Sequence, residues 1–393
     1  MKSISALYKR RMLSWSCVNG KLKSSILLYV LVSAALLIAF TINMDAAYKH
    51  SPGAQKIASE SLLNGELSIL PEEYKHGMVV QRNIFVLSKV IFPSMEYEQL
   101  RKVWMYVLIF ISSLLISVIS LKYYGEVGFV CAAVPTVLYV SLEGFSSLFF
   151  SNLYWLGFLP ALSLVILFYA NTSKKIFWLS FFAALIWFLR GYEYATWYGL
   201  LLVTPFVYQL ARKELSFLEF LHHCLIAFFG FFLAFVVVLS VHAIVLYMEV
   251  DNFSAYIHHM ISKRVVGLEG SEIRCFNVSV SSDMRKWILK DEGLYFGRLI
   301  HYLVAILLLF LIYYRVRMKL QQDVRRLLLA LISCGLWGLI AAVSWYFAAF
   351  YHNSCHHHLN DILYLFPSGL FFTAAYALVI QSYFHKSERK YSH

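Results

Sequence analysis

Charged residues are scarce in this chain. Of its 393 residues only 14% are Asp, Glu, Lys or Arg, whereas soluble domains carry about 25%. Hydrophobic residues make up 60% of the chain and aromatic residues 17%, and the mean hydropathy is +0.65. The shortage of charge excludes an ordinary soluble domain and indicates an integral membrane protein.

Long runs of alternating polar and apolar residues, the pattern of a membrane β-barrel, are also absent. Backbone polar groups in lipid must be paired within the chain, and a helix of about 20 apolar residues spans the hydrocarbon core. The sequence therefore predicts an all-α fold: a polytopic bundle of about ten membrane helices in one integral domain, residues 1–393. The predicted spans are approximately 24–43, 103–121, 126–142, 154–171, 176–190, 196–211, 222–247, 298–314, 327–350 and 362–384.

Acidic residues are in the minority, because 22 Asp and Glu stand against 34 Lys and Arg, for a net charge of +12. The basic residues precede the first span or occupy alternate connections, which is typical of cytoplasmic segments. Their excess therefore does not indicate a nucleic-acid partner. Three connections, near 143–153, 190–196 and 351–361, contain no Lys or Arg except Arg190. We expect these three outside and both termini in the cytoplasm.

Two predicted outer segments are long, residues 44–102 and 249–297. In the first, apolar positions from Val79 to Ile91 predict one or two helices that lie at the membrane interface. The cytoplasmic connections are short, and no βαβ unit with a glycine-rich loop occurs on either side. A soluble nucleotide bound in the usual way is thereby excluded as the energy source, so any reaction is expected at the outer face or within the membrane.

Cysteine forms no metal-binding pattern, because the six cysteines lie singly along the chain. Only Cys275 and Cys355 fall in predicted outer segments, where a disulfide between them is one alternative. Four histidines, in contrast, lie within seven residues of the stretch FYHNSCHHHLNDILYLFP, Phe350–Pro367. A metal site would need three or four ligands with defined geometry. The favoured interpretation is that His356 or His358 hydrogen-bonds a phosphate or a sugar hydroxyl.

The interiors of the predicted spans are nearly free of charge, and ionisable residues gather at their outer ends. Such residues at membrane depth mark a functional site by default. Asp45 follows the first span and is interpreted as a general base, with helix capping as the alternative. Arg190 ends an apolar span and suits a phosphate, although Arg190 and Glu193 could equally form a local ion pair. Tyr192 and Tyr194 suit the faces of sugars, or an interfacial aromatic belt.

Three stretches, SNLYWLGFLPAL, FLRGYEYATW and CHHHLNDILYLFP, resemble segments of bacterial membrane proteins that are found with polysaccharide genes. The layout also resembles the GT-C superfamily of polytopic membrane glycosyltransferases: a first span that ends in an acidic residue, a long first outer loop with interfacial helices, and a multi-span bundle. The resemblance covers the whole chain in layout. It implies a multi-pass enzyme of the bacterial inner membrane.

What this resemblance implies is transfer of a sugar from a polyprenyl-phosphate donor, such as an undecaprenyl-phosphate hexose, to a glycan or lipid acceptor with inversion. Asp45 occupies the place of the base. The chain departs from the commoner pattern in three ways: no second acidic residue adjoins Asp45, no soluble C-terminal domain follows, and the spans are fewer. Glu193 is therefore the alternative base, and Glu72 or Glu73 a remoter one. The residues expected to contact the donor are Arg190, His356, His358, Tyr192, Tyr194, Asn152 and Trp155.

The chemistry of such a transfer needs no metal or cofactor. A lipid phosphate leaves as an anion, so cations or hydrogen-bond donors must lie beside it. An inverting displacement needs one carboxylate to take the proton of the acceptor, and no outer Asp-x-Asp pair is present to hold a divalent ion. The alternatives are an O-antigen-type polymerase, a transporter or flippase of lipid-linked glycans, and a membrane O-acyltransferase with a histidine base.

Overall fold

In the computed structural model every regular element of the described residues is a helix, and the predicted all-α fold is confirmed for them. The described residues are 79–96, 154–192, 194–249, 299–316, 322–348 and 365–391, with shorter pieces between 99 and 123, at 253–255 and at 258, 320 and 363. The helices, in chain order, are α4 (Val79–Ile91), α8 (Tyr154–Phe168), α9 (Ser173–Arg190), α10 (Ala195–Leu201), α11 (Thr204–Ala211), α12 (Phe217–Glu249), α15 (Leu299–Val316), α16 (Gln322–Ala348), the π-helical turn η6 (Leu365–Gly369) and α19 (Leu370–Tyr391).

The predicted span 196–211 is divided in two, into α10 and α11. Pro205 lies in the first turn of α11. In one continuous helix its ring would clash with the carbonyl of Leu201, four residues earlier, and its nitrogen could donate no hydrogen bond. The helix therefore ends at Leu201 and a new one begins at Thr204. The span predicted at 362–384 likewise opens with a distinct element, the π-helical turn η6, which contains Pro367.

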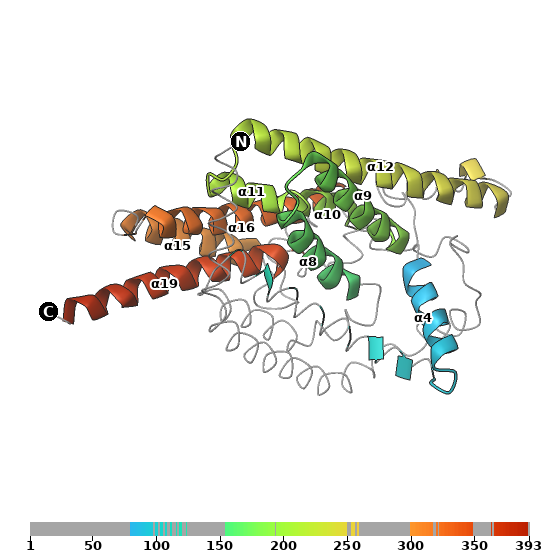
Figure 1. Cartoon of the computed structure of the whole chain (residues 1–393), viewed down its shortest axis with the longest axis horizontal. Coiled ribbons are helices and arrows are strands. Elements are labelled where there is room, and N and C mark those ends of the chain that lie inside the picture. Colours follow the sequence, from blue (N-terminus) through green and yellow to red (C-terminus); the bar gives the residue numbers. More distant parts are fainter. Residues whose placement is uncertain are drawn as a thin grey trace, which may run out of the picture.

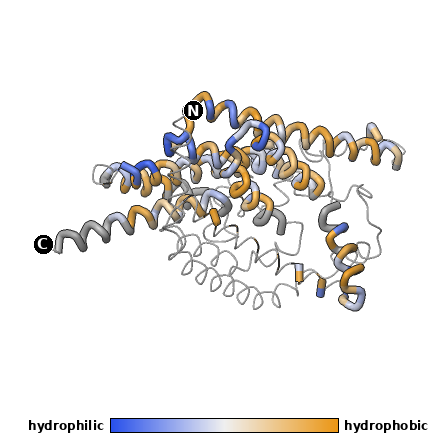
Figure 2. Tube along the Cα trace, in the orientation of Figure 1, coloured by the Kyte–Doolittle hydropathy of each residue, from blue (hydrophilic) through white to orange (hydrophobic). Residues whose placement is uncertain are grey.

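Two of the described helices are long and apolar enough to cross a membrane, the Phe217–Val245 part of α12 and the whole of α16. With 33 residues α12 is about 50 Å long, which exceeds the hydrocarbon core of about 30 Å. Figure 2 shows apolar colouring along most of α12, with a polar stretch near its start. The arrangement of about ten spans stays a prediction.

The exposed side of α12 is as apolar as its buried side. Its exposed large side chains include a row that recurs every three or four residues, which is the spacing of one helix face. The exposed aromatic and aliphatic residues of α9 follow the same spacing. A face of this size would be unusual on a protein surrounded by water, and it matches a lipid environment. The residues of these rows are Leu218, Leu221, Leu225, Phe229, Phe232 and Val236 on α12, and Trp178, Phe182 and Ile186 on α9.

Helix α9 lies along α12, and the two run in the same direction. Near their starts Ser173 Oγ is 3.0 Å from His222 Nε2, and near their ends the Tyr192 hydroxyl is 3.1 Å from His242 Nδ1. Between these contacts Gly230 faces α9 so closely that a Cβ atom there would lie 2.6 Å from the carbonyl oxygen of Phe177. Small residues permit such close approach of helix backbones in membranes.

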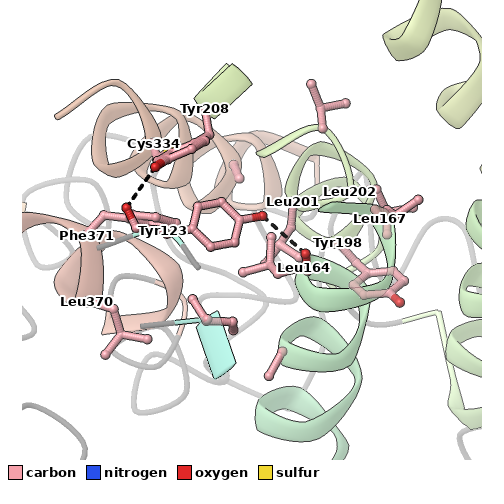
Figure 3. Packing of buried hydrophobic residues seen from close by; sticks show 14 of the residues in the cluster. Tyr123, Leu164, Leu167, Tyr198, Leu201, Leu202, Tyr208, Cys334, Leu370 and Phe371 are labelled. Atoms are coloured by element: carbon pink, nitrogen blue, oxygen red, sulfur yellow. Dashed lines mark hydrogen bonds between the residues drawn. The ribbon is translucent and has the colours of Figure 1, made fainter. Parts of the chain in front are cut away.

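On the other side of the bundle α16 packs against α10, α11, η6 and α19 (Figure 1). The core there surrounds Tyr123, whose ring lies 4.8 Å from that of Tyr208 and 5.5 Å from that of Phe371 (Figure 3). The Tyr123 hydroxyl donates to the Leu164 carbonyl over 3.2 Å, and the Tyr208 hydroxyl donates to the Tyr123 carbonyl over 3.0 Å. These two bonds link α8 and α11 through a residue far from both in the chain.

The basic connections meet at one end of the described helices. The Ser173–His222 contact brings together the starts of α9 and α12, and Arg212 Nη1 donates to the Asp323 carbonyl over 3.2 Å, which joins the end of α11 to the start of α16. The end of α9, the start of α10 and the last turns of α12 and α16 therefore lie toward the opposite end. The basic residues concerned are Lys174, Lys175, Arg212, Lys213, Arg325 and Arg326.

Helix α4 covers the segment for which an amphipathic helix was predicted. It contacts α9, and Figure 1 shows it running across the direction of α12. Val86 and Ser88 are buried, and the Trp104 indole N–H donates to the Ser88 hydroxyl. Val90 and Ile91 are exposed. The helix is thus attached by one face while an apolar face stays open.

Candidate functional site

The candidate site is the turn between α9 and α10, at the end of the bundle away from the basic connections. No charged residue occurs from Ile176 to Leu189, and Arg190 is the last residue of α9. Gly191 ends the helix with φ 157° and ψ 166°, a backbone conformation that side-chain-bearing residues rarely adopt, while its N–H still donates to the Trp187 carbonyl over 3.2 Å. The sequence thus places one cation at the end of a long apolar helix and turns the chain directly after it.

Tyr194 holds the second half of the turn in an unusual conformation. Its φ of 60° and ψ of 25° are left-handed, and for a residue other than glycine this costs on the order of 1–3 kcal/mol. The side chain is buried, with 3% of its surface exposed, and its ring lies 5.2 Å from that of Trp345 on α16. The Tyr194 carbonyl also accepts a hydrogen bond from the N–H of Tyr198 in the first turn of α10, over 2.9 Å. Packing against α16 therefore maintains a turn that local preference disfavours.

Tyr192 is held by the other neighbour of α9. Its hydroxyl is 3.1 Å from Nδ1 of His242 on α12, and the two rings stack with centroids 5.7 Å apart and an interplanar angle of 7°. Phe188 and Phe235 pack against the same tyrosine ring, each at 6.0 Å. The turn is thus connected to α12 through Tyr192 and to α16 through Tyr194.

Of the residues predicted for the site, the structure brings Tyr192 and Tyr194 together with the end of α9, where Arg190 lies. Trp155 is in the first turn of α8. Because α8 and α9 pack together and are joined by a short connection, that turn lies toward the same end of the helix pair as Arg190. The other predicted residues lie outside the described part of the chain: Asp45, Asn152, Glu193, His356 and His358.

His242 is the residue that the sequence analysis missed. It is buried, with 5% of its surface exposed, and no other His, Asp, Glu, Lys or Arg lies between His223 and Glu249 in α12. An ionisable side chain inside a long apolar run is by itself a signal of function in a membrane protein. The sequence shows this signal, but it does not show that His242 contacts Tyr192.

No group of three or more His, Cys, Asp or Glu side chains that could hold a metal ion is present among the described residues. The histidine-rich stretch 350–364 lies almost wholly outside them, so the metal hypothesis for it stays a prediction. Cys224 and Cys334 are buried and free. The two cysteines considered for a disulfide, Cys275 and Cys355, are outside the described ranges.

Comparison with known proteins adds no assignment: no protein-family profile, no curated protein and no solved structure matches this chain.

Proposed function

We propose that the protein is an integral membrane glycosyltransferase that moves a sugar from a polyprenyl-phosphate donor to a glycan or lipid acceptor on the outer face of a bacterial inner membrane. The observation that carries the proposal is the Arg190–Tyr194 turn. It places a cation after the uncharged stretch 176–189 of α9 and two tyrosines after that cation, and a buried histidine of α12, His242, contacts one of the tyrosines. A lipid-linked sugar phosphate presents an anion and an apolar chain at the same membrane depth, and this turn offers a complement to both.

The membrane placement rests on α12, α16 and the exposed apolar faces of α9 and α12. The proposal includes about ten spans with both termini in the cytoplasm. The end that carries the basic connections faces the cytoplasm, as positive residues do in membrane proteins. The Arg190–Tyr194 turn then lies at the outer end, and α4, which crosses the direction of α12, lies along the outer interface.

The reaction proposed is a single displacement. The acceptor oxygen attacks the anomeric carbon while the bond from that carbon to the phosphate oxygen breaks, and the polyprenyl phosphate leaves with the bonding electrons. A carboxylate, Asp45 or Glu193, takes the proton of the acceptor. Arg190, with His356 or His358, stabilises the charge on the leaving phosphate. Tyr192, Trp155 and Asn152 contact the donor sugar or its phosphate, while the buried Tyr194 holds the turn against α16.

The test measures transfer from radiolabelled undecaprenyl-phosphate hexoses to candidate acceptors by the purified protein in lipid nanodiscs. Arg190→Gln is expected to lower the rate about 100-fold, the scale of losing one group that stabilises developing charge. Arg326→Gln is the matched control, because it removes the same charge at the opposite end of the bundle, and it should leave the rate unchanged. Equal rates for the two variants would contradict the proposal.

Variants of the remaining predicted residues assign the roles within the same assay. Asp45→Asn and Glu193→Gln distinguish the two candidate bases, since only substitution of the residue that acts as the base should abolish transfer. His356→Ala tests the phosphate contact, and a chelator tests the metal alternative. Products extended by whole repeat units would favour a polymerase. Movement of the lipid without a new glycosidic bond would favour a flippase, and acyl transfer would favour an acyltransferase.

A further inference from the structure

His242 has a defined place in the geometry of the turn. The residue lies seven positions before the end of α12, in a helix segment whose other side chains are almost all apolar. Only 5% of its surface is exposed. Burying a polar ring among apolar side chains costs free energy unless the ring is hydrogen-bonded. The contact with the Tyr192 hydroxyl offsets part of this cost for His242.

Three kinds of contact, two of them with His242, fix the position of Tyr192. The hydrogen bond to Nδ1 sets the position of the hydroxyl, the near-parallel stacking at 7° sets the ring plane, and Phe188 and Phe235 contact the ring from α9 and α12. A ring held at its polar tip and by its neighbours leaves its own backbone little freedom. Because Tyr192 lies two residues after Arg190 in the chain, the backbone of Arg190 is constrained with it.

The turn needs such anchors because its own backbone does not favour the observed conformation. Tyr194 is at φ 60°, which is strained for a residue other than glycine, whereas Gly191 adopts φ 157° without strain because it has no Cβ. The four residues 191–194 separate two helices. Tyr194 is anchored on Trp345 of α16. Tyr192 on His242 is the matching anchor on α12, so the two contacts hold the turn from both sides.

We infer that His242 is a positioning residue: through its contact with Tyr192 it sets the place of the end of α9, where Arg190 lies, at the lipid-phosphate sugar site. The inference rests on the proposed function for its catalytic consequence, although the contact itself can be tested without it. The side chain is not required to touch the substrate. Its effect is exerted through the tyrosine and the turn.

The variants separate the hydrogen bond from the stacking. His242→Phe keeps a ring and removes the bond, Tyr192→Phe removes the same bond from the other side, and His242→Asn keeps a hydrogen-bonding atom close to the position of Nδ1. His222→Phe is the matched control, because it breaks a histidine-to-hydroxyl contact, with Ser173, between the same two helices at the opposite end.

The first measurement is amide hydrogen exchange of residues 191–196 in nanodiscs, which needs no substrate. In His242→Phe and Tyr192→Phe these amides should exchange about tenfold faster, the scale of one lost hydrogen bond. His242→Asn should restore most of the protection, and His222→Phe should leave it unchanged. Unchanged exchange in both His242→Phe and Tyr192→Phe would overturn the inference.

The second measurement is kcat/KM for transfer from an undecaprenyl-phosphate hexose, corrected for the fraction of folded protein. It should fall about tenfold in each single variant and no further in the double variant, because both remove one interaction, and His242→Asn should recover it. A merely structural role would lower the melting temperature and leave the corrected kcat/KM unchanged, and that result would overturn the inference. A wild-type protein that transfers no sugar would overturn the proposed function, while faster exchange in the two variants would still support His242 as the anchor of the turn.

Discussion

Gly230 offers a sharp test of how α9 and α12 pack, because an added methyl group would meet backbone. A Cβ atom at this position would lie 2.6 Å from the carbonyl oxygen of Phe177 and 3.1 Å from the amide nitrogen of Phe181. These two atoms belong to the backbone of α9, which cannot rotate away as the tip of a side chain can. To restore an ordinary contact of about 3.4 Å the helices would have to separate by about 0.8 Å.

The expected cost follows from that separation. Overpacking of a well-packed interior costs about 1–3 kcal/mol, while the change from glycine to alanine favours a helix by about 0.8–1.0 kcal/mol. Gly199→Ala is the matched control, because its Cβ would meet only the ring of Phe231, at 3.1 Å, and a ring can shift by a few tenths of an ångström. The helix preference cancels between the two variants. Gly230→Ala is therefore expected to be about 1–3 kcal/mol less stable than Gly199→Ala.

The assay is equilibrium unfolding in mixed micelles, with denaturing detergent as the titrant and tryptophan fluorescence as the signal. The quantity compared is the difference in free energy of unfolding between Gly230→Ala and Gly199→Ala. Gly230→Leu should lower the stability further, since its side chain adds atoms to the same contact. If Gly230→Ala is as stable as Gly199→Ala, the close packing of α9 on α12 is refuted.

Two further predictions concern the core around Tyr123 and, separately, the exposed face of α12. Tyr208→Phe removes the hydroxyl that donates to the Tyr123 carbonyl and should lower the free energy of unfolding by about 1 kcal/mol; Tyr169→Phe, on a ring that is 50% exposed, is the control, and equal stability would contradict the bond. Phe229→Asp, near the middle of α12, should oppose membrane insertion by about 2.5–3.5 kcal/mol, whereas Leu218→Asp in the first turn should have little effect. Carbonate extraction of membranes measures both, and a Phe229→Asp protein retained in the membrane as firmly as Leu218→Asp would argue against a lipid-facing α12.

Part of the candidate site could be recognised from the sequence because its signals are local. Arg190 is conspicuous as the single cation that ends an apolar run, and Tyr192 and Tyr194 follow it within four residues. His242 has a comparable local signal, because it is a lone histidine in a long segment without charged residues. Its role depends on Tyr192, which is 50 residues away in the chain. No pattern in the sequence indicates that these two residues are in contact. Trp345 is separated from Tyr194 by still more residues in the chain, and the sequence does not indicate their contact either.

The positions of the helices were determined by the sequence itself. Helix hydrogen bonds join residues four apart, and the length of an apolar run sets how far a helix can extend in lipid. Thus α8, α9, α12, α15 and α16 begin and end within about five residues of the predicted spans. The break at Pro205 also has a local cause, although it was not predicted.

Only the tertiary structure decided which face of each helix packs and what it meets. In α12 the apolar side chains surround the helix, so hydropathy does not distinguish the side that carries Gly230 and His242 from the exposed side that carries Phe229. That choice depends on the shape of α9, where the backbone approaches Gly230 and the Tyr192 hydroxyl reaches His242. Contacts between residues far apart in the chain are set by the fit of whole helix surfaces, and a linear pattern of apolar residues does not specify that fit.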